Sequence, residues 1–195
     1  IPVPPVEYQS YVVGVMATWD AAIEKTGQLI EAKKKLKKAL AQQLLTGKKR
    51  FKEFVGLGWT KTTLGRVAEV LFSNVDKKTH AHERAVYLCN YLDVYNNQYI
   101  TNRLNFMNAS VTEAEVTKFG LRYGDVIVTK DSETPDDIAN PAVVIEQLQN
   151  VVCGYHLAIL RPRTDIVTGS FLSHVLMLPS VRHQFSRIAN GATRF

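Results

Sequence analysis

Residues 30–51 read IEAKKKLKKALAQQLLTGKKRF, in which eight side chains are Lys or Arg and only Glu31 is acidic. The leucines recur three or four residues apart, which is the spacing of one helix face. Gly47 follows the last apolar turn, where a glycine often ends a helix, and the next residues, Lys-Lys-Arg, suit the negative end of the helix dipole. A solvated helix usually balances its charges at i,i+4 spacing, and this one does not. A charged helix face without a special role is the simplest alternative.

The same helical period extends back to residue 6, so the sequence predicts a helix of roughly 40 residues and about 60 Å. A globular domain built from the remaining residues is only about 30–40 Å across. Much of the apolar face must therefore find its partner on another chain or on a further part of this one. We expect a coiled-coil-type arm whose packing seam consists of Met16, Trp19, Ile23, Leu29, Ile30, Leu36, Leu40 and Leu44.

Beyond a glycine-containing linker near residue 57, the pattern changes to β-branched and aromatic runs of strand length. These runs are residues 64–71, 85–95, 98–106, 125–130, 141–145 and 151–160. A capping-box pattern, Ser110 to Glu113, opens a short helix that Gly120 ends, and residues 171–177 and 180–189 are predicted helices separated by Pro179. The predicted class is α+β: a long N-terminal helix, then a globular, mostly antiparallel β-rich domain with short helices. We place the two domains at residues 1–50 and 51–195.

Composition limits the possible functions. The chain has 195 residues, 46% hydrophobic and 22% charged, which is typical of a globular protein, and no apolar run approaches the roughly 18 residues of a membrane span. The net charge of +6 favours an anionic partner. Cys89 and Cys153 stand in apolar runs, so we expect reduced core thiols and a cytoplasmic protein. Because the chain begins at Ile1 without a Met and ends abruptly at Phe195, we expect a piece of a longer protein.

The sequence contains no catalytic signature that we can identify. Glycine-rich phosphate or dinucleotide loops are absent, and no serine or cysteine nucleophile motif occurs. His80 and His82 lack further ligands at zinc spacing, so an exposed turn is the favoured interpretation. Residues 131–137, DSETPDD, could hold Mg²⁺ in a nuclease, although the same residue types are ordinary turn formers. We expect no metal, no cofactor and no catalysis.

Several motifs in order resemble the specificity subunits of type I restriction–modification systems. Residues 1–9, IPVPPVEYQ, and the LLTGK at 44–48 resemble the conserved spacer of that family, with Tyr8 as an extra residue that adjusts the helix entry. Residues 59–65, WTKTTLG, resemble the opening of a target recognition domain, and GDVI at 124–127 resembles its central strand. Residues 190–194, NGATR, resemble the segment that leads into the next spacer. The resemblance covers nearly the whole chain and implies one spacer followed by one recognition domain.

This resemblance implies a non-catalytic subunit that recognises one half of a bipartite target in double-stranded DNA. It also implies methyltransferase (M) subunits and a restriction (R) subunit as partners, and a second spacer helix, or a second copy of the chain, against the seam. Residues 131–137 follow a strand, where a scaffold can present base-reading side chains. The expected DNA contacts are Lys48, Lys49, Arg50, Lys77, Lys78, Lys130, Ser132, Glu133, Thr134, Asn190 and Arg194. Two alternatives stay open: a metal-dependent nuclease using residues 131–137, and a coiled-coil adaptor that binds only protein.

Overall fold

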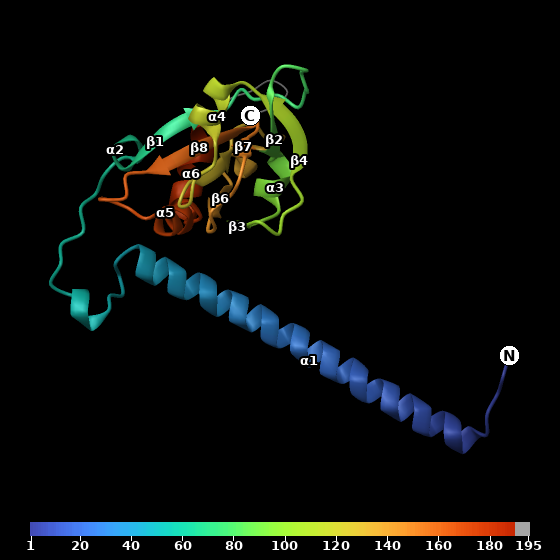
Figure 1. The fold of residues 1–195 in the computed structure, drawn as a ribbon. Helices are drawn as coiled ribbons and strands as arrows, with labels where there is room; N and C mark the ends of the chain where they lie inside the picture. Colours follow the sequence, from blue (N-terminus) through green and yellow to red (C-terminus); the bar gives the residue numbers. More distant parts are fainter. Residues whose placement is uncertain (190–195) are drawn as a thin grey trace. The chain divides into compact units, whose positions relative to one another are not determined.

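The structure is a computed structural model, and it describes residues 1–189. The chain forms two compact units, Ile1–Leu57 and a second unit from Gly58 onward (Figure 1). We call the first the arm and the second the globular unit. Among the described residues, none of the helices combines the length and the hydropathy that a membrane crossing requires.

The arm consists mainly of α1 (Val6–Leu45), a helix of 40 residues that follows Pro5. Gly47 has a φ of +70°, a conformation that favours glycine, and it ends the helix as the sequence predicts. No residue of α1 is buried. A short 3-10 helix, η1 (Lys52–Phe54), follows. The prediction of a long N-terminal helix is confirmed, and its apolar seam is exposed to solvent.

The globular unit contains two β-sheets. The five-stranded sheet has the order β1 (Ala68–Phe72), β8 (Leu157–Pro162), β5 (Val126–Thr129), β6 (Pro141–Val144) and β3 (Tyr99–Ile100). The three-stranded sheet has the order β4 (Met107–Val111), β2 (Arg84–Cys89) and β7 (Val151–Cys153). Only the β2–β7 and β3–β6 pairs are parallel among the pairs that join these strands. The prediction of a mostly antiparallel domain is confirmed.

The globular unit also contains short helices. They are α2 (Leu64–Val67), α3 (Tyr91–Tyr95), α4 (Glu113–Phe119), the 3-10 helix η2 (Pro135–Asp137), α5 (Gly169–Leu176) and α6 (Pro179–Ile188). Thr168 caps α5 by accepting the Phe171 N–H at 3.3 Å, and Pro179 occupies the first turn of α6, where its missing N–H is harmless. The two C-terminal helices predicted from sequence are therefore present.

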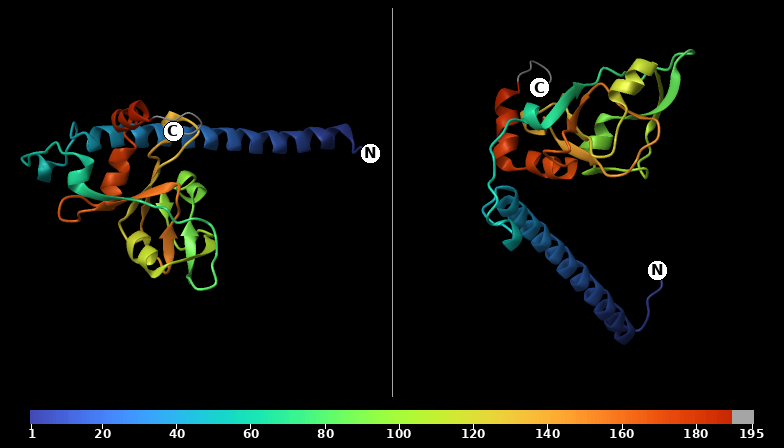
Figure 2. Two further views of the ribbon diagram at one scale, coloured as in Figure 1. Left: turned by 90° about the horizontal axis from the view of Figure 1, so that it is seen from above. Right: turned by 60° about the vertical axis from the view of Figure 1, so that its left-hand side comes forward.

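The five-stranded sheet is buried on both faces, because alternate residues of its central strands belong to different cores. Ile127 and Ile159 face the three-stranded sheet in one core, whereas Val126 and Leu160 pack with α5 and α6 in the other. A strand buried on both faces reads as a continuous apolar run instead of an alternating one, as these strands do. The result is three layers: the small sheet, the large sheet and the helix pair (Figure 2). Cys89 and Cys153 are free thiols in the first core.

Several predicted strands are shorter than expected, because short helices and turns interrupt the runs. Residues 64–71 begin as α2 before β1, and residues 98–106 form only the two-residue strand β3. The run at 85–95 divides at Asn90, whose N–H is bound by the Asp93 carboxylate at 2.7 Å, so that α3 follows β2. The run at 151–160 divides at Gly154, where a turn separates β7 from β8.

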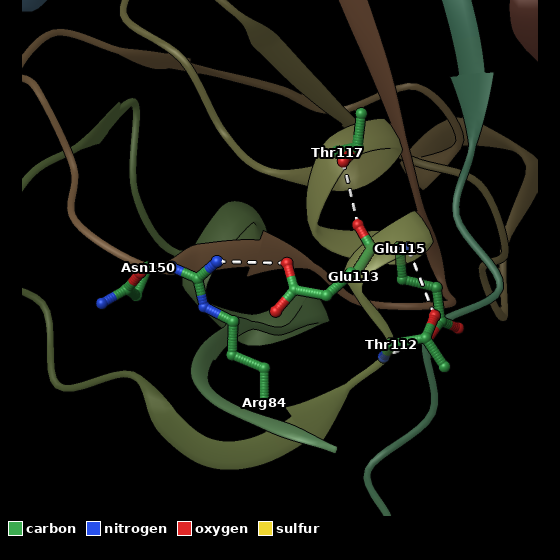
Figure 3. A network of polar contacts seen from close by, with 6 residues as sticks. All are labelled: Arg84, Thr112, Glu113, Glu115, Thr117 and Asn150. Atoms are coloured by element: carbon green, nitrogen blue, oxygen red, sulfur yellow. Dashed lines mark hydrogen bonds and ion pairs between the residues drawn. The ribbon is translucent and has the colours of Figure 1, made fainter. Parts of the chain in front are cut away.

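The capping box of α4 lies two residues later than predicted. Thr112 accepts the Glu115 N–H at 3.3 Å, and Glu115 accepts the Thr112 N–H at 2.9 Å (Figure 3). Ser110 instead lies buried in β4, where its hydroxyl donates to Glu83 at 2.7 Å. The predicted helix cap, Ser110, is therefore a residue of a strand. The predicted end of the helix at Gly120 is confirmed.

Candidate nucleic-acid interface

Positive charge is concentrated in the arm. Residues 1–57 carry ten Lys or Arg and five Asp or Glu, whereas residues 58–195 carry fourteen and thirteen. Five of the arm's lysines fall between residues 33 and 38, and of these only Lys34 forms an ion pair within the described residues, with exposed Glu31 at 2.7 Å. Exposed ion pairs of this kind contribute little to stability. The positive charge of the other lysines attracts anions. The arm is thus the more attractive part of the chain for a polyanion.

The basic residues after α1 have different environments. Lys48 and Lys49 are exposed, whereas Arg50 is half-buried. The Arg50 guanidinium donates to the Gly47 carbonyl at 3.3 Å and to the Leu57 carbonyl at 2.6 Å. Arg50 therefore closes the loop that follows the helix. Lys48 and Lys49 are the two members of this group whose side chains are presented to solvent.

Residues 131–137, which we call the acidic loop, are held in place from three directions. Asp131 contacts His156 of the β7–β8 turn at 2.7 Å, and the Tyr95 hydroxyl of α3 donates to Asp137 at 3.2 Å. Arg182 of α6 donates to the Ile138 carbonyl at 2.7 Å and also to the Asp136 carbonyl. Burial lowers the pKa of Arg182, while the nearby Asp137 and Asp136 oppose that shift. The acidic loop is a fixed structure built on α3, α6 and the sheet.

The base-reading candidates at this loop do not form a common exposed tip. Lys130 is half-buried, and its ammonium group donates to the Ser73 carbonyl at 3.3 Å. Ser132 is only 5% exposed, and its hydroxyl accepts the Thr134 N–H at 3.4 Å. The Thr134 hydroxyl donates to Asp137 at 2.8 Å, and Glu133 is exposed. Whether Lys130, Ser132, Glu133 or Thr134 touches DNA stays a prediction.

Lys77 and Lys78 lie in a second loop, residues 73–83, which joins the two sheets. This loop starts at Ser73 beside Lys130, and the Ser110 hydroxyl anchors its far end by accepting the His80 N–H at 2.7 Å. Both lysine side chains are exposed. At the start of the next strand, Arg84 bridges Glu113 at 3.3 Å and Asn150 at 2.7 Å (Figure 3). Asn190 and Arg194 lie outside the described residues.

The carboxylates that could have supported a nuclease are directed to separate partners. Asp131 contacts His156, whereas Asp137 accepts hydrogen bonds from Tyr95 and Thr134. Within residues 1–189, no three side chains of His, Cys, Asp or Glu come together as possible metal ligands.

Similar folds occur among solved structures. No protein-family model matches the chain, and no curated protein matches it. A solved chain from work on complex assembly and conformational transition of the type I R-M system covers 93% of this chain, with a TM-score of 0.52 and 17% identity. The chain has the fold of that type I R-M protein. The resemblance to this class of protein inferred from the motifs is therefore confirmed at the level of the fold.

A second solved structure is the HsdS subunit from Thermoanaerobacter tengcongensis, which covers 97% of this chain with a TM-score of 0.45 and 17% identity. The chain spans 44% and 45% of the lengths of these two solved chains.

Beside the acidic loop, this type I R-M fold contains a cleft that the sequence did not predict. We call it the α3 cleft. It has a volume of about 370 Å³ and is lined by Tyr91, Leu92, Tyr95, Asp131, Ser132, Glu133, Asp137 and His156. The tyrosines were missed because their segment was predicted as a strand, which would have separated them. The pair Asn90 and Asp93, with the spacing of a helix cap, is the signal that could have revealed α3.

Proposed function

We propose that this chain is part of a DNA sequence-recognition subunit of a type I restriction–modification complex and has no catalytic activity of its own. The globular unit would bind one half of a bipartite target, and M and R subunits would be directed to the DNA through the complex. The observation that carries this proposal is the shared fold over 93% of the chain. The role implies a cytoplasmic protein with access to DNA.

The distribution of charge supports DNA binding. Phosphate contacts from Lys and Arg supply most of the affinity for DNA and fix the protein's register. Lys48 and Lys49 at the end of the arm, and Lys77 and Lys78 on the second loop, are exposed cations suited to such contacts. Lys130 is a candidate for either a phosphate or a guanine contact. The arm's seam would pack against a second spacer helix or a second copy of the chain.

The salt dependence of DNA binding by the full chain tests this proposal. If about five phosphates are neutralised, log K falls with log[salt] with a slope of about −4 to −5. Lys48→Ala with Lys49→Ala then flattens the slope by about 2. The control removes the same charge elsewhere, by Lys25→Ala with Lys61→Ala, and leaves the slope near its original value. An equal effect of both pairs would remove Lys48 and Lys49 from the DNA interface.

One observation favours a second candidate function. The seam of α1 is exposed along its length, as expected of a coiled-coil adaptor that binds only protein. The same experiment separates the two functions. A full chain that shows no salt-dependent binding to any duplex, yet still pairs through its seam, would be the adaptor.

A further inference from the structure

The first wall of the α3 cleft is aromatic. Tyr91 and Tyr95 lie one helical turn apart on α3, with ring centroids 5.5 Å apart and an interplanar angle of 16°. The helix that carries them is fixed, because Val94 is fully buried in the core and the Asn90–Asp93 cap sets its start. Tyr95 is 40% exposed, so aromatic surface is available from solvent.

The cleft also has an acidic wall, which meets the aromatic one where the Tyr95 hydroxyl donates to Asp137 at 3.2 Å. Asp131, Glu133 and Asp137 all line the cleft, and no Lys or Arg is among its lining residues. Asp131 contacts His156 at 2.7 Å, and Asp137 also lies near Arg182, which is not among the lining residues. The negative potential extends to the aromatic wall, since Asp137 raises the pKa of Tyr95 by disfavouring a phenolate beside it. A ligand with positive charge and several hydrogen-bond donors would complement this wall.

Ser132 adds a polar group to the lining of the cleft. Its residue is 5% exposed and lines the cleft, and its hydroxyl accepts the Thr134 N–H at 3.4 Å. Within residues 1–189 that hydroxyl has no acceptor for its own proton. A ligand that carries a hydrogen-bond acceptor would use that proton. The complementary ligand therefore combines a cationic group with a nearby acceptor, as a basic side chain attached to a peptide backbone does.

DNA is a poor occupant of this cleft. Duplex DNA carries one negative charge per about 1.7 Å of its axis, so its approach would bring phosphates towards three carboxylates. An arginine has the opposite properties. Its planar guanidinium stacks on aromatic rings, and its fork of N–H groups matches carboxylate oxygens. Its own backbone carbonyl can accept the free proton of a hydroxyl such as that of Ser132.

We propose that the α3 cleft is a docking site for an arginine side chain presented by a protein partner. The guanidinium lies against the tyrosines and bonds to Glu133 and its acidic neighbours, while the adjoining peptide group meets Ser132. This assignment goes beyond the proposed DNA-binding role and does not depend on it. It moves Ser132 and Glu133 from base reading to protein binding.

The test uses the full chain, with 3-fluorotyrosine in place of tyrosine, and the peptide acetyl-Gly-Arg-Gly-amide as the probe. We expect the ¹⁹F signals of Tyr91 and Tyr95, assigned by single Tyr→Phe substitutions, to shift saturably at millimolar peptide. The matched peptide carries citrulline, which has nearly the shape of arginine but no charge, and it should leave both signals in place. Absence of a saturable shift with the arginine peptide, or equal shifts with the citrulline peptide, would overturn the proposal.

Two substitutions locate the binding. Glu133→Gln removes one exposed carboxylate. It should lower the affinity for the arginine peptide about two- to fivefold, which is the contribution of an exposed ion pair. Asp165→Asn removes an exposed carboxylate that does not line the cleft and should change nothing. An unaltered affinity in Glu133→Gln counts against the site. A duplex that shifts the same two tyrosines and displaces the arginine peptide would show that the cleft faces DNA, and the proposal would be wrong even though DNA binding held.

Discussion

Asp125 and Arg161 form a bidentate ion pair inside the globular unit, with the Arg161 Nε and Nη2 atoms 3.0 Å and 2.9 Å from the Asp125 carboxylate oxygens. The Asp125 side chain is 2% exposed. Arg161 also donates to the Gly120 carbonyl at 3.0 Å, and Asp125 accepts the Arg122 N–H at 2.9 Å. The hydrogen bond to Asp125 raises the pKa of Arg161. The pair therefore joins β8, the entry to β5 and the end of α4.

Asp125→Asn should leave a half-buried guanidinium without its counter-charge. Breaking one side of a buried pair typically costs about 3–5 kcal/mol, whereas replacing both partners with apolar groups can be nearly neutral. We expect Asp125→Asn to lower the free energy of unfolding in urea by that amount. Arg163→Gln, at an exposed position two residues along the chain, is the control and should have little effect. A loss below about 1 kcal/mol in Asp125→Asn would show that the pair is not a main stabilising contact.

Gly124 and Gly169 approach each other so closely that no side chain fits between them. A Cβ atom at Gly169 would lie 1.9 Å from the Gly124 carbonyl oxygen, and Gly124 itself has a φ of +86°. Gly169→Ala should therefore displace the start of α5 from the sheet. We expect a loss of at least about 1–3 kcal/mol, the usual cost of overpacking, measured by thermal unfolding. Gly65→Ala, where nothing lies within 4 Å of the added Cβ, provides the control.

Asp93 should make stability depend on pH in the direction opposite to most carboxylates. Burial raises the pKa of Asp93, although the hydrogen bond from the Asn90 N–H opposes the shift. The folded state then binds the Asp93 proton more tightly than the unfolded state, whose carboxyl titrates near pH 4. Stability from this group is thus greatest below that pH and is lost as pH rises through the higher folded pKa.

Asp93→Asn keeps an oxygen acceptor for the Asn90 N–H and removes the titration. Relative to this variant, the wild-type chain should therefore lose stability as pH rises from about 4 through the raised folded pKa. Urea unfolding of both proteins at several pH values measures that difference, in which the other carboxylates cancel. If the stability of the wild-type protein instead increased relative to the variant as pH rises, the hydrogen bond would outweigh burial in its effect on the Asp93 pKa.

The sequence predicted the helix whose apolar period continues over many turns and the strands that are buried on both faces. The helix over residues 6–45 and the strands β5 and β6 were found this way, because solvent or two cores impose an unambiguous pattern. It failed where a run of β-formers contains a helix cap. Asn90 and Asp93 convert the end of one predicted strand into α3, and no count of apolar residues detects that change.

The candidate site was less predictable than the fold, because its features arise from contacts distant in sequence. Arg182 and Asp136 are far apart in the chain, as are Asp131 and His156, yet these pairs fix the acidic loop. Ser132 was expected among the DNA contacts, and its burial by the surrounding residues could not be read from the sequence. The motif tryptophan, Trp59, gave no hint of its contact with Phe171 of α5, where the ring centroids are 6.4 Å apart. Short motifs identified the fold, whereas the shape of the cleft depended on tertiary packing.

The seam of α1 should drive pairing of the chain with itself when no other helix covers it. Trp19 is 67% exposed and Ile23 is 68% exposed, and burying such side chains contributes roughly 1.5–3 kcal/mol each. Most helical stability in proteins comes from packing an apolar face, so a 40-residue helix with no buried residue lacks that contribution. We expect sedimentation equilibrium to show association that rises with protein concentration.

Ile23→Glu places a charge in the centre of the seam and should weaken that association by at least tenfold, since about 1.4 kcal/mol corresponds to a factor of ten. Ala17→Glu adds the same charge on the opposite face of α1, by the helical period of 3.6 residues, and should leave association unchanged. Because both substitutions add one carboxylate, any effect of net charge on the arm is matched. A wild-type chain that stays monomeric at every concentration would mean that the seam needs a different helix, and equal weakening by both variants would mean that charge, not apolar burial, governs the pairing.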